Sequence, residues 1–331
     1  MIDEVDAIAP MPKRLFKAAM AANANNYSHY WVRPKTQFGS FKLTVHVQSQ
    51  EMSWKICPMK FFVGHNLFGT NNLARILDGI LRAIYQRFGL SYTEKDGDFY
   101  AENGVQLSRL DLTGGFQVGS QAEVVETMYL LREHFIDHGF EIVVHEGPDG
   151  IETLYLGKNS STSTLKFYNK YLQMLDDKKL KLLPYYNELL SHAESEVRFE
   201  FAARDPYLAS RGLQNSKEWT VGKVREIMVQ TIKDLGLSTT LVEKLPIDEV
   251  DGLSDACRAK YTLWLAGNNL KEHFPPHTFA RDRKFFLAKG IDIARSHSKA
   301  QDAAVLSELL SINQLRSTWP KRFVPLGAVY R

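Results

Sequence analysis

The amino-acid sequence predicts an α+β fold in two domains, and three observations support this prediction. The chain has 331 residues, which is longer than one average domain and shorter than three. Up to about Gly212, strand patterns are mixed with helical patterns without alternating strictly with them. Beyond Gly212, strand signals nearly vanish and helical patterns follow one another. We therefore predict a sheet domain over residues 1–212 and a mostly helical domain over residues 213–331.

The first domain begins its clear pattern with a strand at Phe41–Val47, where apolar and polar residues alternate. Asn71 or Asn72 is expected to cap a helix with a continuous apolar stripe. A second helix is expected over Gln121–His138, closed by a glycine. Further predicted elements are strands at Trp54–Ile56, Phe61–Val63, Leu107–Thr113, Glu141–Val144, Thr153–Leu156, Thr164–Asn169 and Glu196–Ala202, and a helical stretch at Tyr171–Ser191 that is interrupted at Pro184.

The second domain is predicted to contain helices at Trp219–Leu235, Asp255–Ala266, Thr278–Lys289 and Ala300–Leu310. The order of helix, turn, short helix and helix in its middle is typical of a helix-turn-helix or winged-helix-like module. Arg281, Arg283 and Lys284 would then lie on a helix suited to the major groove of DNA. A three-helix packing module without DNA contact fits the same pattern about equally well.

Net charge, cysteine content and apolar runs limit the classes of protein to which this chain can belong. The net charge of +3 is mildly basic, which permits nucleic-acid binding without arguing for it. Cys57 and Cys257 lie far apart, so neither a disulfide framework nor a Cys-x-x-Cys zinc site is expected. No apolar run approaches the length of a membrane span, and Met1–Met20 lacks the apolar core of a signal peptide. We therefore expect a cytoplasmic protein.

Three of the predicted strands share a property that ordinary core strands lack. In each, one face is apolar and the other carries charged or reactive groups, because successive side chains of a strand point to opposite sides. The polar faces carry Arg109, Asp111 and Thr113 in the first strand, Lys166, Tyr168 and Lys170 in the second, and Glu196, Arg198 and Glu200 in the third. If these strands lie side by side in one sheet, their polar side chains lie together on one face of it.

This set of side chains suits phosphoryl transfer. Asp111 and Glu200 supply the carboxylate oxygens that Mg²⁺ or Mn²⁺ prefers, and such a metal would polarise a scissile phosphate. Tyr168 is a candidate nucleophile that needs activation, because the ordinary pKa of tyrosine is about 10. Lys170, two residues further on, would lower that pKa or neutralise the phosphate.

The remaining cations of these strands are candidates for binding phosphate. Arg109 and Arg198 carry planar guanidinium groups that match phosphate oxygens, and Lys166 adds a further positive charge. A second interpretation fits each strand taken alone. An antiparallel sheet often has one solvated face, on which alternating Arg, Glu and Lys form cross-strand ion pairs.

Four sequence blocks carry a resemblance to a known family. They are Gly64–Thr70, Ser108–Thr113, Thr164–Lys170 and Val197–Glu200, and the resemblance extends from about Gly64 to Gly212. In order and rough spacing these blocks resemble those of the replication initiators of filamentous phages, of the gene II protein type. One such block would be weak evidence, whereas four in sequence are fairly specific.

The resemblance implies an HUH-like nuclease domain with a central antiparallel sheet, and a rolling-circle mechanism. Such initiators nick the plus strand at an origin through a tyrosine, leave a 5′-phosphotyrosyl link and a free 3′-hydroxyl, and later rejoin the strand. The nucleophile of the family falls on Tyr168. The three strands also look like those of plasmid initiators of the Rep_trans type, whose acidic metal ligands fall on Asp111 and Glu200.

The resemblance also implies partners and a location. Origin DNA, both duplex and single-stranded, is the expected substrate. Host helicase, DNA polymerase and single-strand-binding protein are expected partners, in the cytoplasm of a bacterial host.

The sequence departs from the HUH pattern, because no His-hydrophobic-His triplet is present. The nearest is His46-Val47-Gln48, whose participation in metal binding stays open. His65 begins a loop before a helix whose N-terminus would favour a phosphate, although a simple glycine-bounded turn fits as well. Two other functions remain: a conjugative-type relaxase or transposase, and a non-catalytic origin-binding replication repressor.

Overall fold

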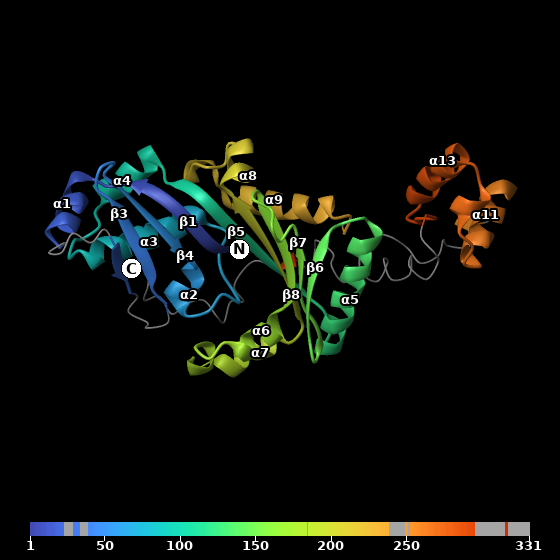
Figure 1. Ribbon diagram of the computed structural model, residues 1–331, viewed down its shortest axis with the longest axis horizontal. Helices are drawn as coiled ribbons and strands as arrows, with labels where there is room; N and C mark the ends of the chain where they lie inside the picture. Colours follow the sequence, from blue (N-terminus) through green and yellow to red (C-terminus); the bar gives the residue numbers. More distant parts are fainter. Residues whose placement is uncertain are drawn as a thin grey trace.

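The structure is a computed structural model that describes residues 1–22, 29–33, 39–183, 185–237, 249–250 and 252–294, together with the backbone of 315–316. It is a mixed α+β molecule built on one large antiparallel sheet, as the sequence predicts (Figure 1). The predicted helix at Ala300–Leu310 lies outside the described residues. Within the described part of the chain, no helix is long and apolar enough to cross a membrane.

The sheet runs in the order β2-β3-β4-β1-β5-β9-β8-β7-β6, and β10 pairs with β5. Every pairing along this order is antiparallel. The strands are β1 (Ile2–Pro10), β2 (His29–Val32), β3 (Phe41–His46), β4 (Glu51–Ile56), β5 (Gln106–Gln117), β6 (Ile142–Gly147), β7 (Gly150–Leu156), β8 (Ser163–Asn169), β9 (Glu196–Arg204) and β10 (Leu315–Arg316). The polar strands predicted from the sequence are therefore β5, β8 and β9.

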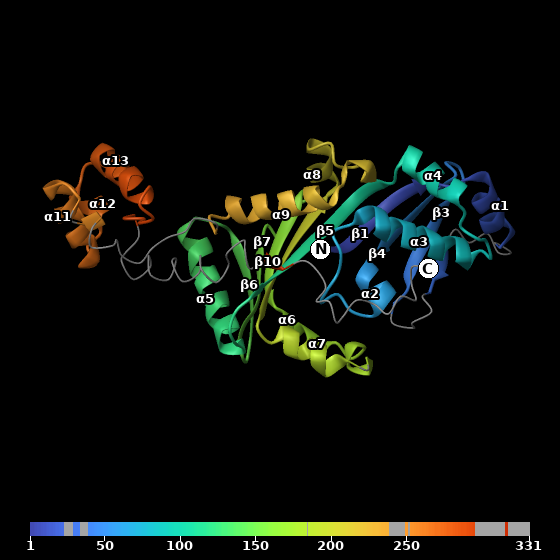
Figure 2. The same cartoon turned by 180° about the vertical axis from the view of Figure 1, so that it is seen from behind.

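Helices α3, α5 and α9 cover one face of the sheet, which Figure 2 shows. Much of the other face is open and is turned toward the viewer of Figure 1. The helices of this domain are α1 (Lys13–Ala21), α2 (Pro58–Val63), α3 (Leu73–Arg87), α4 (Glu94–Asn103), α5 (Gln121–Asp137), α6 (Lys170–Asp176), α7 (Tyr186–Ala193), α8 (Asp205–Ser210) and α9 (Val221–Asp234), with 3₁₀ turns η1 (Leu180–Leu182) and η2 (Ser216–Glu218).

The two predicted long helices are confirmed, and the predicted asparagine cap of the first is confirmed as Asn72. The Asn72 side chain accepts a hydrogen bond from the Arg75 amide at the start of α3, and Ser120 accepts one from the Glu123 amide at the start of α5. The apolar stripe of each helix is buried against the sheet. The sequence pattern therefore predicts both helix starts correctly.

The prediction of a strand at Phe61–Val63 is wrong, because these residues form the end of α2. Pro58 stands at the start of the helix, where its fixed φ and missing N–H are tolerated. Gly64 then ends the helix with φ +86°, a left-handed conformation that glycine adopts without strain. A short apolar run does not by itself distinguish a strand from a helical turn.

In the described part of the first 32 residues, the sequence carries no clear signal for β1, α1 and β2. The most important is β1, which lies between β4 and β5 in the middle of the sheet. Its acidic residues and alanines are poor strand formers, and a bulge interrupts its pairing with β5 between Ile2 and Glu4.

The helical segment after the sheet domain has its own small core. Helices α11 (Asp255–Leu265), α12 (Leu270–His273) and α13 (Pro276–Leu287) enclose a cluster that includes Trp264 and Phe286, both fully buried. Helix α9, which the sequence assigns to the second domain, packs instead in the core of the sheet domain. The division at residue 212 stays a prediction, as does the winged-helix-like character of the module.

Candidate functional site

The three polar strands are neighbours in the sheet, in the order β5-β9-β8. Glu200 on β9 lies opposite Thr113 on one side and opposite Lys166 on the other, and Arg198 lies opposite Tyr168. Residues that lie opposite one another in an antiparallel pair share a face of the sheet. The polar faces therefore form one continuous surface, which is the arrangement on which the phosphoryl-transfer interpretation depends.

Tyr168 lies within this surface and is only 3% exposed. Its hydroxyl donates a 3.5 Å hydrogen bond to Oε2 of Glu200, whose other oxygen is 2.8 Å from Nζ of Lys166. Nζ of Lys166 also lies 4.5 Å from the centre of the Tyr168 ring. Burial, followed by the Glu200 charge, raises the pKa of Tyr168 well above its usual value. In this arrangement the phenol is neutral.

Arg198 is buried beside Tyr168, with 2% of its surface exposed. It forms a 2.6 Å ion pair with Glu196 and donates to the backbone carbonyls of Asn66 and Leu67. The interaction of Arg198 with Tyr168 opposes the rise in the pKa of the phenol. A buried cation directly beside the candidate nucleophile is placed to neutralise negative charge that develops there.

Lys170 is the first residue of α6 and is 1% exposed. Its Nζ donates to Asn66 Oδ1 at 3.0 Å and to Gln173 Oε1 at 2.7 Å, and it lies 5.9 Å from the Tyr168 ring centre. Asn66 in turn donates to the buried carboxylate of Asp3. Burial, followed by the Arg198 charge, lowers the pKa of Lys170 to about 7. A pKa in this range places the change between the charged and neutral forms of Lys170 near neutral pH.

Asp111 is buried on β5 and is held by its neighbour two residues earlier. Nε and a terminal nitrogen of Arg109 donate to its two oxygens at 2.8 and 2.7 Å. Arg109 also lies 3.2 Å from Glu4 of β1. Burial raises the pKa of Asp111 to about 6, and the charges of Glu200 and Glu4 act in the same direction against the lowering effect of Arg109. These carboxylates are close enough to affect one another.

The described residues contain no group of three or more His, Cys, Asp or Glu side chains that could hold a metal ion. Mg²⁺, however, is often bound by only one or two carboxylates together with waters and substrate phosphates. Asp111 and Glu200, on neighbouring strands and one face of the sheet, fit a site of this limited kind. Both carboxylates are held by cations in this structure, Asp111 by Arg109 and Glu200 by Lys166.

The histidines suggested by the sequence do not join this group as open ligands. His46 ends β3 at an exposed position and shares a 2.9 Å hydrogen bond with Ser53, three strands away from β5 in the sheet order. Gln48 lies in the turn after β3. His65 is near the site but buried, and burial, followed by Lys170 and Arg198, lowers its pKa to about 3. It is thus a neutral side chain, without the charge that a phosphate would prefer.

The three cations predicted for DNA contact in the second domain lie exposed on α13. Arg283 forms an ion pair with Asp292 at 2.8 Å, and Arg281 lies 3.3 Å from Asp282. Lys284 is the third exposed cation of this helix. They are not part of the Tyr168 site, and their role stays a prediction.

Several residues that build the site escape sequence reasoning. Asp3, Glu4 and Asn66 enter it only because β1 lies beside β5 and because the loop after α2 returns to β9. Asn66 carries the available signal, since it lies within the Gly64–Thr70 block. Asp3 and Glu4 carry none, because the sequence pattern does not reveal β1.

Comparison with known proteins identifies the family. The family model of the phage replication-associated protein known as gene II protein, in its N-terminal part, matches residues 7–222 of this chain. The chain belongs to this gene II protein family. The resemblance and the role of rolling-circle replication initiator predicted from the sequence are thereby confirmed at the level of the family.

This member of the gene II protein family is also similar to individual proteins. It is 23% identical to the replication-associated gene II protein of Enterobacteria phage I2-2, over 98% of this chain and 96% of that protein. A solved rolling-circle replication initiator protein from Geobacillus stearothermophilus aligns with 70% of this chain and 83% of its own, at 13% identity and a TM-score of 0.34. So low a TM-score adds no argument about the site.

Proposed function

We propose that this protein of the gene II family nicks and rejoins one strand of origin DNA, using Tyr168 as the nucleophile. The observation that supports this most directly is the environment of its hydroxyl. Tyr168 faces Glu200 at 3.5 Å, pairs across the sheet with Arg198, and lies under Lys166. A proton acceptor and two cations around one phenol make up the set of groups that attack on a phosphate diester requires.

The Tyr168 oxygen forms a bond to phosphorus while the bond from phosphorus to the 3′-oxygen breaks, giving a 5′-phosphotyrosyl link and a 3′-hydroxyl. The phenol proton passes toward the Glu200 carboxylate, and the leaving 3′-oxygen takes up a proton. Arg198 and Lys166 offset the negative charge on the phosphate oxygens. Rejoining is the reverse attack by a 3′-hydroxyl.

A divalent metal, Mg²⁺ or Mn²⁺, is part of the proposal, with Asp111 and Glu200 as the residues that would hold it. When bound, it would polarise the scissile phosphate. Burial lowers the pKa of Lys170 to about 7. We propose that Lys170 offsets the negative charge of the phosphate beside Tyr168. It remains buried next to Tyr168 and held by Asn66.

The helical module is proposed to bind duplex origin DNA through α13. Support comes from the exposure of Arg281, Arg283 and Lys284 on this helix, which gives cations access to phosphates or base edges. Host helicase, polymerase and single-strand-binding protein are the partners we propose for the later steps of replication.

A nicking assay on supercoiled DNA that carries the protein's own replicon tests this function. We expect relaxation with Mg²⁺ or Mn²⁺, loss of relaxation with EDTA, and no relaxation by Tyr168→Phe with either metal. Tyr171→Phe is the matched control, because Tyr171 is the next tyrosine but lies on α6 among other side chains. Tight duplex binding without nicking by the wild type would overturn the proposal in favour of a non-catalytic origin binder.

A further inference from the structure

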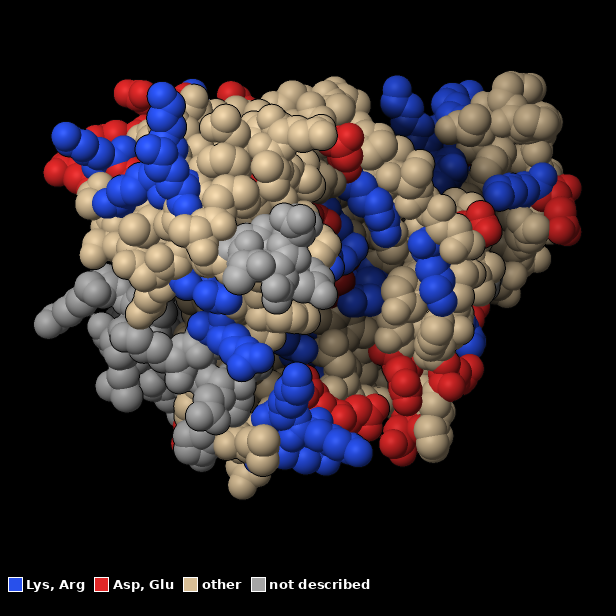
Figure 3. All heavy atoms as spheres, turned by 60° about the vertical axis from the view of Figure 1, so that its left-hand side comes forward, with Lys and Arg blue, Asp and Glu red and all other residues tan. Residues whose placement is uncertain are grey.

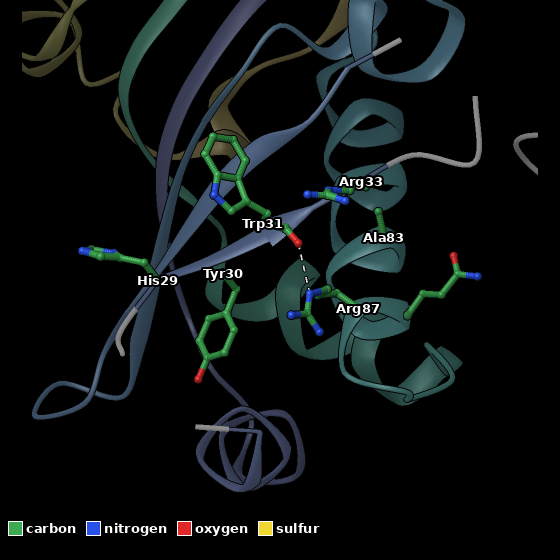
Figure 4. Close-up of a pocket in the computed structure, with 7 residues that line it drawn as sticks. His29, Tyr30, Trp31, Arg33, Ala83 and Arg87 are labelled. Carbon is green, nitrogen blue, oxygen red and sulfur yellow. Dashed lines mark hydrogen bonds between the residues drawn. The ribbon is translucent and has the colours of Figure 1, made fainter. Parts of the chain in front are cut away.

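The edge of the sheet farthest from β6 carries an exposed aromatic pocket outside the Tyr168 site. Trp31 of β2 is 57% exposed, unlike the buried tryptophans at positions 54, 219 and 264. It lines a hollow of about 620 Å³ together with Arg33 and with Arg87 of α3. Figure 4 shows the Trp31 and Tyr30 rings on opposite sides of β2, with both arginines on the α3 side of Trp31.

The Trp31 ring stands on the same face of the sheet as Tyr168. Trp31 lies opposite Lys42 of β3, and the Leu43–Trp54 pair next to it brings Lys42 beside Lys55 of β4. The register continues through β1 to β5, since Asp6 lies opposite both Lys55 and Arg109. One row of side chains therefore crosses the sheet from the Trp31 pocket to the strand that carries Asp111.

Cations outnumber acidic residues along this row, in which Lys42, Lys55 and Arg109 lie with Asp6. Lys42 and Lys55 are exposed side by side, and like charges directly opposite one another destabilise a sheet. Lys55 is paired with Glu4, whereas Lys42 forms no salt bridge with any residue that the structure describes. Figure 3, which brings the β2 end forward, shows Lys and Arg side chains gathered around a hollow in this view.

We propose that the Trp31 pocket is a stacking site for a base of the single strand that the protein cleaves, and that the strand crosses the open sheet face over Lys55 and Lys42. This inference rests on the proposed function for its substrate. Single-stranded DNA is recognised by cationic grooves that follow the backbone and by aromatic rings on which bases stack. Trp31 supplies the ring, the neighbouring Arg33 supplies a cation for an adjoining phosphate, and the lysine pair supplies the path. Arg87 holds β2 from the α3 side instead, because its Nε donates to the Trp31 carbonyl and its guanidinium lies over the Tyr30 ring.

The distance from Tyr168 to Trp31 sets the length of single-stranded DNA that can reach both residues. Tyr168 on β8 is six inter-strand steps from β2. At about 4.8 Å per step this is roughly 29 Å across the sheet, and it is a minimum, because the row that contains Trp31 meets β8 near Ser163, before Tyr168. A strand with B-like stacking, at about 3.4 Å per nucleotide, would need about nine nucleotides to cover it, and an extended strand would need fewer. The Trp31 site should therefore act only on oligonucleotides of about this length or longer.

Binding of fluorescein-labelled oligothymidylates by the full chain tests the proposal, with Tyr168→Phe as the background so that no cleavage occurs. We expect Trp31→Ala to weaken binding of a 16-mer roughly 5- to 150-fold, the range that loss of one base–aromatic stack produces. The loss should shrink for a 4-mer, which is too short to span both regions. Trp31→Phe should keep most of the affinity, because a ring remains.

Matched variants make the result specific. Ile136→Ala removes a side chain of similar exposure from α5, on the covered side of the sheet, and should leave the affinity unchanged. Lys42→Ala should weaken the 16-mer and reduce the salt dependence of its binding by about one charge. Unchanged 16-mer affinity in Trp31→Ala would overturn the proposal and leave the open edge of β2 to another ligand, such as an added peptide strand.

These measurements are separate from the test of the proposed function. Nicking is measured with Tyr168 present, whereas the stacking site is measured by affinity with Tyr168 replaced. A nicking protein whose Trp31→Ala variant binds the 16-mer normally would contradict only the stacking site. A protein that never nicks but loses 16-mer affinity on Trp31→Ala would contradict only the nucleophile.

Discussion

The two halves of the open sheet face differ in how far water reaches them. Around β5, β9 and β8, Tyr168, Arg198 and Lys170 are at most 3% exposed. Around β2, β3 and β4, by contrast, Trp31, Lys42 and Lys55 are exposed. Polar and apolar residues alternate in β3 and β4 as they do in β5, β8 and β9, so this pattern does not distinguish the two halves.

The difference is accompanied by shifted pKa values in the buried half. Burial raises the pKa of Tyr168 and Asp111 and lowers the pKa of Lys170, because a charged group loses its hydration there. An ordinary solvated face of ion pairs would not shift titrating groups in this way. We therefore propose that reaction takes place in the buried half and binding in the exposed half.

The largest effect on stability is expected at Arg198. Arg198→Met leaves Glu196 buried without its cation and two backbone carbonyls without their donor. Breaking a buried ion pair in this way costs about 3–5 kcal/mol of unfolding free energy, measurable by urea denaturation. Lys223→Met, which breaks an exposed pair with Glu226, should cost no more than about 1 kcal/mol. If the two substitutions lowered the unfolding free energy equally, the buried Arg198–Glu196 pair would be no more important for stability than the exposed Lys223–Glu226 pair.

The next effect concerns the proposed metal. Asp111→Asn should raise the Mg²⁺ concentration needed for half-maximal nicking by at least the roughly 10–100-fold that loss of even an outer-shell partner produces. Titration of nicking against Mg²⁺ measures it. Asp6→Asn, on the same face but one strand further from β9, is the control. An unchanged Mg²⁺ requirement in Asp111→Asn would remove Asp111 as a ligand.

The lowered pKa of Lys170 predicts that the free energy of unfolding depends on pH. Its pKa is about 7 in the folded protein and about 10.4 when unfolded, so the unfolded chain binds more protons between these values. The free energy of unfolding should therefore rise with pH above about 7, and this contribution should be flat at lower pH. Urea unfolding between pH 7 and pH 9 should show a smaller slope for Lys170→Met. An identical slope would mean that Lys170 keeps its proton in the fold.

The smallest effect is expected in the exposed half. Trp31→Ala and Lys42→Ala should change the free energy of unfolding by no more than about 0.5 kcal/mol, because neither side chain is buried. Urea denaturation of both variants beside Arg198→Met makes the comparison direct. A loss of several kcal/mol on Trp31→Ala would mean that the ring packs as part of the core.

Much of the half that carries Tyr168 is predictable from the sequence, since the alternation within β5, β8 and β9 reveals their polar faces. Their adjacency is not, because periodicity within a strand does not specify which strands pair. The position of β1 escapes prediction because its pairing overrides the poor strand propensity of its acidic residues. Burial of Arg198 is also unpredictable, since its guanidinium donates to the loop that carries Asn66.

The central claim is that the Tyr168 oxygen becomes covalently joined to DNA. The most direct measurement digests the protein after reaction with a single-stranded origin oligonucleotide and maps the attached nucleotide by mass spectrometry. The account predicts a 5′-phosphate adduct on the peptide that contains Tyr168, and its absence from Tyr168→Phe. An adduct on a different residue, or cleavage that leaves no covalent adduct at any time, would contradict it.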